Sequence, residues 1–453
     1  MTIVEFARKL RAGAITSEQA TEACLDRIRT DDERLNAFIR VTGDEARRQA
    51  RDADRERAAG VDRGLLHGAP ISLKDLLDVR GLPTTAASRV REGHVAASDC
   101  PAVTHLRQAG AVFVGKTNLH EFAFGTTSED SAFGPVKNPC DPGRSAGGSS
   151  GGSAASVAAG MALATIGTDT GGSIRIPAAA CGIVGLKPTF GEVSAEGVVP
   201  LSYTFDHVGP LAASVEDAWI VYKALLGQPP AETPAPAPAS ALRLGVLRPY
   251  FCDLLDDDVR ARFEEALAAI ARTGARLDEV DVRHAADIAP VYTQISIADA
   301  AAYHARTLES MPEKYHPSVR LRLEMGRYML AEDYARARLG CERLRREVDA
   351  ALAGRHALVL PTLPIPAPRL GASTVTIDGA PQPVRAMMLR LTQAFNVTGH
   401  PAVSLPCGAT REGMPCAIQL VGARMETDAL VRVALAVEQI LAKGAVVAPS
   451  PGS

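Results

Sequence analysis

Two features of the sequence could carry out chemistry: a glycine- and serine-rich stretch, and a lysine inside an apolar run. The stretch, residues 143–173, reads GRSAGGSSGGSAASVAAGMALATIGTDTGGS and contains no aromatic side chain. Because glycine has no Cβ, such a segment lets the backbone approach another group closely. The same composition is typical of a flexible linker. Here the Gly/Ser clusters flank an apolar run, which indicates that they are attached to a packed helix.

A nucleotide-binding role for this stretch is not supported. A P-loop needs a lysine directly after its glycines, and no lysine lies between Lys137 and Lys187. The Rossmann spacing G-x-G-x-x-G is missing as well. The sequence therefore argues against a phosphate-binding loop.

Residues 147–151 match the G-x-S-x-G pattern of a nucleophile elbow, in which Ser149 would be the nucleophile of an α/β-hydrolase-type esterase. The elbow requires a preceding strand, but residues 138–143 hold two prolines and no apolar run, and this composition disfavours a strand. A histidine base would have to come from a loop, with His207 and His400 as the candidates, and neither has an evident aspartate partner in the sequence. This esterase stays open as an alternative.

Lys74 lies in the run PISLKDLL, residues 70–77, in a chain that has only eight lysines among 49 basic residues. Burial favours the neutral amine, which lowers the pKa of the lysine and makes it a usable base near neutral pH. A neutral amine can take a proton from a serine directly or through a second hydroxyl. A surface lysine paired with Asp75 is the alternative.

Together these segments resemble the amidase signature family. Three separated elements occur in order and with the family's spacing: the lysine of ISLKD, GGSSGGS at residues 147–153, and GTDTGGSIRIPAAACGIVGLKPT at residues 167–189. The resemblance continues through residues 116–122, 206–210 and 395–402. It covers roughly the whole chain and is weakest over residues 230–350.

The resemblance implies a hydrolase with a Ser-Ser-Lys arrangement in place of Ser-His-Asp. Ser173 would be the nucleophile, Ser149, held after an unusual cis peptide, would relay the proton, and Lys74 would be the base. This arrangement accounts for the lack of a convincing His–Asp pair. Four consecutive backbone N–H groups would form the oxyanion hole, those of Thr170, Gly171, Gly172 and Ser173. Losing one such donor typically costs on the order of 3 kcal/mol of transition-state stabilisation.

Three neighbouring residues are expected to support this site. Ser150 follows the relay serine, and Asp169 and Arg175 flank the glycine loop. We expect these two charges to pair and hold the loop's shape, with two separate surface charges as the alternative. A helix expected to begin near Ser153 would place its positive N-terminus close to Lys74 and further disfavour the ammonium. Activity should therefore rise with pH on the acid side.

The resemblance implies cleavage of a C–N bond in a small amide or carbamate through a covalent acyl-enzyme, and some similar enzymes also hydrolyse esters. We expect an aryl amide or a urethane, because no charged residue marks the pocket in the sequence. The loop at residues 124–128 corresponds to one that lines the acyl pocket in similar enzymes. Its small residues Gly125, Thr126 and Thr127 would leave room for substrate. A plain loop is the alternative.

One subgroup of the family transfers ammonia to misacylated transfer RNA as one chain of a larger assembly. A protein like this glutamine amidotransferase chain, acting in a complex, is therefore the alternative function. Ile176 follows Arg175 where that subgroup usually has Gln, and Asp206-His207 stands where Asp-Gln is usual. These departures favour a stand-alone hydrolase.

The composition of the 453 residues, 46% hydrophobic and 22% charged with a formal charge of −3, is ordinary globular usage. No Lys/Arg cluster is interleaved with aromatic residues, so we expect a small-molecule substrate and neither nucleic acid nor a membrane. Eight scattered cysteines without C-x-x-C spacing predict neither a disulfide framework nor a zinc site. We expect no metal and no cofactor. The first ten residues lack the apolar core of a signal peptide, which predicts a cytoplasmic protein. A monomer or homodimer is expected, although no sequence feature selects between them.

The elements that must position these residues follow an α/β pattern. Short apolar runs at residues 70–73, 112–115 and 183–186 predict strands, and the resemblance implies a large mixed β-sheet covered by helices on both faces. The apolar residues 154–166 are expected to form a buried helix that is too short to span a membrane. Residues 1–60 are expected to be an N-terminal helical layer.

The Pro/Ala-rich segment at residues 228–241 predicts an extended surface linker between two halves of the chain. Residues 256–353 are expected to be a mostly helical insert or cap. Strands are expected before and after this insert, at residues 242–247, 356–361, 401–406 and 417–421, and a closing helix at 428–441. One sheet built from both halves, and hence a single domain over residues 1–453, is the prediction.

Overall fold

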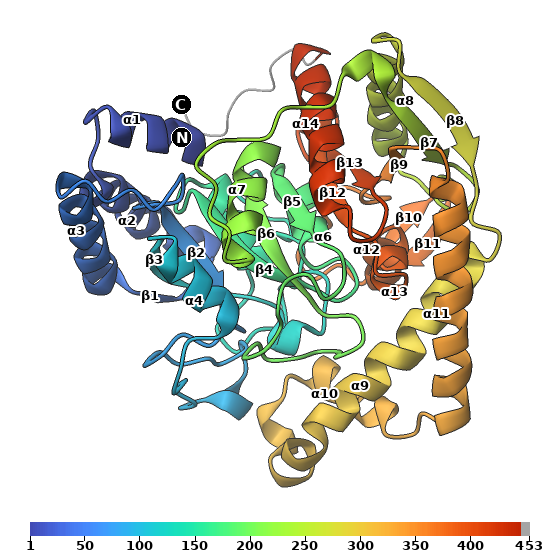
Figure 1. Cartoon of the computed structure of the whole chain (residues 1–453). Helices are drawn as coiled ribbons and strands as arrows, with labels where there is room; N and C mark the ends of the chain where they lie inside the picture. The colour runs from blue at the N-terminus through green and yellow to red at the C-terminus, as the bar shows by residue number, and fades with distance from the viewer. Residues whose placement is uncertain (445–453) are drawn as a thin grey trace.

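Within residues 1–444, which the computed structural model describes, an eleven-stranded mixed sheet has the order β1-β3-β2-β4-β6-β5-β12-β13-β9-β7-β8 (Figure 1). Its strands are β1 (Phe38–Val41), β2 (Pro70–Lys74), β3 (Val112–Thr117), β4 (Ala164–Asp169), β5 (Val184–Lys187), β6 (His207–Ala212), β7 (Arg243–Leu247), β8 (Arg276–Val280), β9 (Ala357–Pro361), β12 (Ala402–Ala409) and β13 (Pro415–Val421). A separate antiparallel pair is formed by β10 (Thr374–Ile377) and β11 (Ala380–Pro383). Parallel and antiparallel neighbours both occur in the large sheet.

Helices cover both faces of the sheet, with α4, α7, α8 and α14 on one face and α3, α5 and α6 on the other. The helices are α1 (Ile3–Arg11), α2 (Ser17–Leu35), α3 (Gly43–Ala58), α4 (Pro101–Gln108), α5 (Gly151–Ala158), α6 (Arg175–Cys181), α7 (Val215–Leu225), α8 (Asp257–Ala271), α9 (Ile288–Ser310), α10 (Pro317–Gly326), α11 (Ala331–Leu352), α12 (Val384–Arg390), α13 (Ala394–Val397) and α14 (Thr427–Gly444). Successive strand residues point to opposite faces. Val112 and Val114 of β3 accordingly lie in the cluster with α3 and α5, whereas Phe113 lies in the cluster with α4.

The strands expected from apolar runs are present as β2, β3, β5, β7, β9, β12 and β13. The helix expected over residues 154–166 is wrong in its second half. α5 ends at Ala158, Gly160 has a positive φ of 70°, and β4 begins at Ala164. A left-handed glycine just past the last turn is a common helix stop, and the β-branched residues that follow suit a strand.

The N-terminal segment, residues 1–60, is not purely helical. It contains α1, α2 and α3, but also β1, which pairs antiparallel with β3 and places Val41 opposite Gly115. β1 forms one edge of the sheet. The segment is therefore joined to the sheet by backbone hydrogen bonds as well as by packing.

The segment expected to be a helical insert, residues 256–353, is mostly helical, but its first part belongs to the sheet. α8 packs on β12 and β13, and β8 pairs in parallel with β7 at the other edge. Residues 256–280 are thus no cap. α9, α10 and α11 make up the rest and lie together along one side of the molecule (Figure 1).

Residues 228–241 run along the surface without an α-helix or a strand. Hydrogen bonds hold their backbone to the rest of the protein. Leu65 N–H donates to the Pro230 carbonyl at 3.0 Å, Ala237 N–H donates to the Arg432 carbonyl at 2.9 Å, and the Arg432 Nε donates to the Ala235 carbonyl at 3.2 Å. The segment crosses between the two halves of the chain in an extended form.

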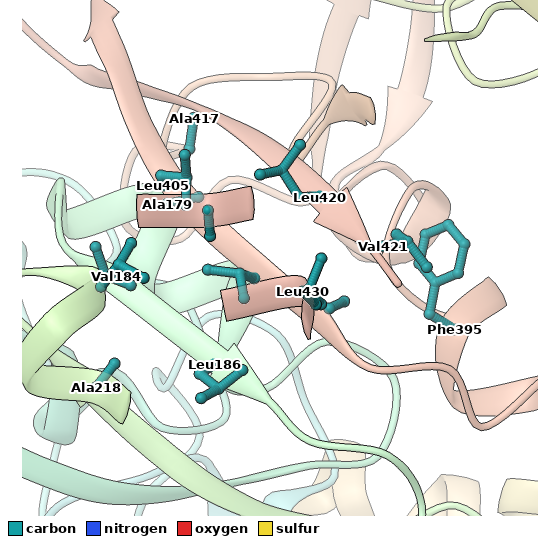
Figure 2. Close-up of a cluster of buried hydrophobic side chains, with 14 of the residues drawn as sticks. Ala179, Val184, Leu186, Ala218, Phe395, Leu405, Ala417, Leu420, Val421 and Leu430 are labelled. Atoms are coloured by element: carbon teal, nitrogen blue, oxygen red, sulfur yellow. The ribbon is translucent and has the colours of Figure 1, made fainter. Parts of the chain in front are cut away.

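Side chains from the two halves share one core. Val184 of β5, in the first half, packs in the same cluster as Leu405 of β12 and Leu430 of α14, in the second half (Figure 2). β5 and β12 are also hydrogen-bonded neighbours, with Leu186 opposite Val403. The sheet is therefore continuous across the two halves.

The carboxyl ends of β2 and β4 lie side by side. These strands are parallel, with Leu73 opposite Ile166, so Lys74 at the end of β2 lies near residues 167–169 at the end of β4. α5 packs on both strands and brings Ser149, two residues before its start, to the same edge. Ligands of open α/β sheets bind outside the carboxyl ends of the strands.

Candidate active site

The side chain of Lys74 is fully buried and surrounded by hydroxyl groups. Its Nζ lies 2.8 Å from the Ser149 Oγ, 2.8 Å from the Ser150 Oγ and 2.7 Å from the Thr168 Oγ1. The alternative of a surface lysine paired with Asp75 is wrong. Asp75 instead forms an ion pair with Lys116, also buried, at 2.8 Å.

Burial lowers the pKa of Lys74 from 10.5 to about 7, although the negative charges of Asp169 and Asp206 act in the opposite direction. A neutral amine has two N–H donors and one lone pair. Three hydroxyl neighbours match this set, because one hydroxyl can donate to the lone pair while the other two accept. The arrangement therefore suits a proton-accepting lysine near neutral pH.

Ser149 is fully buried and directly follows the cis peptide bond between Gly148 and Ser149. Its carbonyl accepts hydrogen bonds from the Ser128 hydroxyl and the His120 N–H, both at 3.1 Å. No residue from 118 to 148 belongs to a strand. The strand that a nucleophile elbow requires is thus missing, and Ser149 faces Lys74 instead of a histidine.

Ser150 directly precedes α5, which begins two residues earlier than expected, and its side chain does not cap the helix. Its hydroxyl contacts both Lys74 and the Thr168 carbonyl, the latter at 3.2 Å. The helix N-terminus therefore lies beside the amine. Its partial positive charge disfavours an ammonium there.

Ser173 is 6% exposed. Its backbone carbonyl accepts a hydrogen bond at 3.3 Å from the N–H of Ser150, the residue that follows Ser149. Within the described part of the chain its hydroxyl forms no hydrogen bond with another residue, the Ser149 hydroxyl included. The structure therefore places the two serines as neighbours, with the nucleophile candidate free to meet a substrate.

The loop from Thr170 to Ser173 presents four consecutive backbone N–H groups that donate to no acceptor among residues 1–444. Two positions in this loop need glycine, because neighbouring side chains lie where a Cβ would be. A Cβ on Gly171 would lie 2.5 Å from the Tyr292 hydroxyl, and Gly172 has a φ of 138°, with Thr392 Oγ1 only 2.2 Å from where its Cβ would be. Free N–H groups in a row are what an oxyanion hole needs.

Asp169 and Arg175 form a fully buried, two-pronged ion pair, with distances of 2.9 and 3.0 Å. The alternative of two surface charges is wrong. Burial acts to raise the pKa of Asp169, but the Arg175 guanidinium holds it well below its usual range. Asp169 also accepts from the Ile174 N–H at 3.1 Å. Asp169, just before the glycine loop, is therefore bonded to Ile174 and Arg175, just after it.

Several partners of this pair were not identified from the sequence. Arg175 also donates to the Thr392 carbonyl at 2.8 Å, to Gln419 Oε1 at 2.6 Å and to Asn396 Oδ1 at 2.7 Å. These partners lie more than 200 positions further along the chain. No local pattern indicated Thr392 or Gln419. Asn396 lies inside the segment 395–402 of the resemblance, and Thr168, one position before Asp169, lies inside the GTDTGGS motif, so both of these carried a usable signal.

The two histidines considered as bases are occupied elsewhere. His207 Nε2 lies 3.1 Å from the Nζ of Lys187, and burial holds the pKa of His207 well below its usual value. His400 does have an aspartate partner, contrary to the sequence-based expectation, because Asp349 of α11 lies 2.9 Å from its Nε2. Neither histidine contacts Ser149 among the described residues.

The loop expected to line the acyl pocket lies against the relay serine. Gly148 packs against the backbone of Thr126, with a Cβ there 2.9 Å from the Thr126 carbonyl carbon, and Gly125 packs on the His120 ring. Thr126 is buried, and the Thr127 carbonyl accepts from the Ser145 hydroxyl at 2.8 Å.

The expectation that no charge marks this region is wrong. The guanidinium groups of Arg322 and Arg385 both donate to the carbonyl of Phe124, at 2.8 and 3.4 Å. Both come from the second half of the chain, on α10 and α12. Motifs in the sequence did not indicate these arginines, because they lie far along the chain from Phe124.

No group of three or more His, Cys, Asp or Glu side chains among the described residues is placed to hold a metal ion.

None of the helices in residues 1–444 combines the length and apolar character that crossing a bilayer would require.

Known proteins resemble this chain over nearly its full length. The family model described as Amidase matches residues 19–431. An amidase of Pseudomonas putida is 39% identical over 453 aligned residues, which cover 97% of this chain and 96% of the relative. A glutamyl-tRNA(Gln) amidotransferase chain of Koribacter versatilis is 36% identical, covering 95% of this chain and 97% of that protein.

Solved structures share the fold. A crystal structure of an amidase superposes with a TM-score of 0.91 at 38% identity and covers 97% of this chain and 99% of that one. The inhibitor-bound structure of a protein complex tied to the origins of an s-triazine catabolic enzyme gives a TM-score of 0.90 at 33% identity, covering 97% and 98%.

Proposed function

Because the chain belongs to the amidase signature family, we propose that it hydrolyses the C–N bond of a small amide or carbamate through a covalent acyl-enzyme. Ser173 is the nucleophile, Ser149 the proton relay and Lys74 the base. The observation that carries this proposal is the fully buried amine of Lys74, 2.8 Å from the Ser149 hydroxyl, next to a loop of free N–H groups.

The first half of the reaction forms the acyl-enzyme. Neutral Lys74 accepts the proton of the Ser149 hydroxyl, which takes the proton of Ser173 as the Ser173 oxygen bonds to the substrate carbonyl carbon. The carbonyl oxygen becomes negative and accepts hydrogen bonds from the N–H groups of residues 170–173. When the C–N bond breaks, the Lys74 ammonium returns the proton through Ser149 to the leaving nitrogen.

The second half releases the acid. Water replaces the departed amine, and Lys74 takes its proton through Ser149 as the water oxygen bonds to the acyl carbon. The ester bond to Ser173 then breaks and its oxygen regains a proton. The products are a carboxylic acid and an amine, or carbon dioxide, an alcohol and an amine from a carbamate.

A role as one chain of a glutamine amidotransferase complex is the second candidate, supported by the 36% identity to the Koribacter versatilis protein. Ile176 and the Asp206-His207 pair depart from the usual residues of that subgroup. An esterase that uses Ser149 as its nucleophile has less support, because no strand precedes this serine and its hydroxyl contacts Lys74.

The proposal is tested with the purified chain on a panel of primary amides, nitroanilides and carbamates, by amine or ammonia release. We expect the chain alone to hydrolyse at least one member, and Ser173→Ala to lower its kcat by at least about a thousandfold. Activity that appears only after partner chains are added would overturn the proposal in favour of the amidotransferase. Full activity of Ser173→Ala would overturn the assigned nucleophile.

A further inference from the structure

The loop at residues 170–173 is held from its rear by hydrogen bonds to its carbonyl groups, and we propose that Thr392 is a positioning residue of the proposed reaction. Its hydroxyl directs the Gly172 N–H toward the oxyanion that forms from the substrate's carbonyl group. This inference rests on the proposed function, because the loop needs well-aimed donors only if it stabilises such an oxyanion.

Each peptide group of the loop links a carbonyl on one side to an N–H on the other. The peptide bonds of residues 169–173 are all trans. A trans peptide group is planar, and the C=O of one residue and the N–H of the next point in opposite directions. A hydrogen bond that fixes the carbonyl therefore fixes the direction of the N–H as well. Hydrogen bonds in a chain also polarise one another, so the N–H becomes a stronger donor.

The Thr392 hydroxyl fixes the middle of the loop. It donates at 2.6 Å to the carbonyl of Gly171, which shares its peptide group with the Gly172 N–H. Thr392 is fully buried and lies two residues after α12. A threonine hydroxyl commonly bonds a helix carbonyl three or four residues earlier, and here the Leu389 carbonyl lies at 3.3 Å. Because the hydroxyl has one proton, the shorter distance assigns this proton to the loop.

The first and last peptide groups of the loop are held in the same way. In the first, the Asp169 carbonyl accepts a hydrogen bond from the Asn396 side-chain amide at 2.9 Å. In the last, the Gly172 carbonyl accepts one from the Ile176 N–H at 2.7 Å. Together with the peptide held by Thr392, three of the four N–H groups belong to peptide groups whose carbonyls are fixed.

The Thr392 hydroxyl is the part of this arrangement that a substitution can remove most selectively. Asn396 also bonds the Asp169 carboxylate at 2.8 Å and Arg175 at 2.7 Å, so its replacement would disturb the buried ion pair. The Thr392 hydroxyl, within residues 1–444, forms hydrogen bonds only with the two carbonyls named above. Removing it therefore isolates the contact with the loop.

Thr392 is itself fixed in place. Its backbone carbonyl accepts from the Arg175 guanidinium at 2.8 Å, and this arginine pairs with Asp169 just before the loop. Its Oγ1 lies 2.2 Å from where a Cβ on Gly172 would be, so the side chain packs directly on the loop. A positioning group needs such support, because its own orientation must be locked.

Thr392→Val tests the role, because it replaces the hydroxyl with a methyl group of similar volume. We expect kcat for the best amide to fall about 10- to 100-fold, since a small misplacement of a catalytic group can cost about a hundredfold. KM should stay within about threefold, because the lost interaction acts mainly in the transition state. Steady-state kinetics measures both constants.

The variants Thr392→Ser and Thr392→Ala separate positioning from packing. Serine keeps the hydroxyl and lacks the methyl group, whereas alanine lacks both. Positioning predicts that serine keeps kcat within about threefold of the wild type while alanine behaves like valine. A packing role predicts the opposite order, in which valine is the best substitute and serine leaves a cavity.

Thr42→Val is the matched control, because the Thr42 hydroxyl also donates to a backbone carbonyl, that of Phe113 at 2.8 Å. Phe113 lies near the start of β3, which runs parallel to β2, so this contact is at the end of the strands away from Lys74. We expect Thr42→Val to leave kcat within about twofold, because it removes no contact to the loop.

A transition-state analogue provides a second readout. When a trifluoromethyl ketone with the acyl group of the best amide binds, the Ser173 oxygen adds to its carbonyl carbon. The serine proton passes through Ser149 to Lys74, and the ketone oxygen becomes the oxyanion. Thr392→Val should weaken this inhibition about 10- to 100-fold, in parallel with the loss of kcat/KM. Binding of the amide itself, measured in a Ser173→Ala background, should change by less than about threefold.

The outcomes distinguish this role from the proposed function. Full kcat in both the valine and the alanine variant, or a serine variant slower than the valine variant, would overturn the positioning role while the amidase function stands. If circular dichroism shows that Thr392→Val does not fold, the serine and alanine variants decide, and equal kcat values would overturn the role. A wild type that hydrolyses no amide would overturn the proposed function and this role with it.

Discussion

Lys74 is the residue on which the proposed chemistry depends, and its surroundings explain how a lysine can accept a proton near neutral pH. Full burial removes the water that would stabilise an ammonium. The hydroxyl groups of Ser149, Ser150 and Thr168 are dipoles that suit either protonation state, so the amine keeps partners in both. Asp169 and Asp206 raise the pKa again from a distance and keep it from falling further.

The pH dependence of the rate follows from the lowered pKa of Lys74, about 7. In the proposed mechanism the neutral amine is the active form, so the active fraction falls as pH drops through 7 and saturates above it. At non-saturating substrate, kcat/KM should fall about tenfold per unit below pH 6 and level off above about pH 8. A steady-state pH profile checks this. A rate that stays flat from pH 5 to 10 would contradict it.

At the residue scale, contiguous motifs predicted candidate residues that the structure places close together. The positions of Lys74, Ser149 and Ser173 could be predicted from motifs, and the structure brings all three to the ends of β2 and β4. Arg322 and Arg385 could not be predicted. They reach the Phe124 carbonyl from 198 and 261 positions away, and an arginine on an amphipathic helix gives no sign that it faces inward.

The loop at residues 170–173 is the element in which backbone shape should decide the rate, because we propose that its N–H groups hold the oxyanion. Gly172→Ala should lower kcat by about a hundredfold, since misplacing one oxyanion donor costs that much and a Cβ would collide with Thr392. Steady-state kinetics on the best amide checks this. The control is Gly160→Ala, which also has a positive φ but has open space around its Cβ position. If both variants keep full activity, the loop does not hold the oxyanion.

The buried pair of Asp169 and Arg175 should be needed for the fold around this loop. Asp169→Asn leaves a buried guanidinium without its counter-charge, which costs about 3–5 kcal/mol of the free energy of unfolding. Urea unfolding measures the change. Asp26→Asn removes the partner of Arg29 in a largely exposed ion pair, and should leave the free energy of unfolding nearly unchanged. Equal effects of the two substitutions would contradict this account.

At the element scale, apolar runs predicted strands such as β2 and β12 because their side chains are buried on both faces. Two strands, β4 and β8, were not predicted from apolar runs, for different reasons. β4 ends in Gly-Thr-Asp and follows an alanine-rich helix, so its apolar part merged with that helix in the sequence pattern. β8, with the sequence RLDEV, has three charged residues among five and lies at an edge of the sheet, where a strand does not need an apolar face.

The whole molecule joins two halves of the chain through the pairing of β5 with β12 and through a shared core (Figure 2). We therefore propose that the chain folds as a single domain. Its two-half organisation was evident from the Pro/Ala-rich segment, whereas the strand order was not, because neighbours in the sheet such as β5 and β12 are far apart in sequence. Long-range pairing of this kind is set by tertiary packing rather than by local propensity.

Dividing the chain within residues 228–241 tests this organisation. Fragments 1–234 and 235–453 should each be insoluble or unfolded alone, because each would expose an unpaired strand edge and half of a core. Produced together, they should associate and regain activity, as measured by gel filtration and amide hydrolysis. A first fragment that is folded, soluble and monomeric on its own would show that the halves are independent domains.

Labelling with a fluorophosphonate followed by peptide mapping in a mass spectrometer tests the central assignment most directly. The account predicts a single covalent adduct on Ser173, formed at a rate that rises as pH increases through about 7 and lost when Lys74 is replaced by methionine. An adduct on Ser149, or labelling at an undiminished rate after the replacement of Lys74, would contradict it.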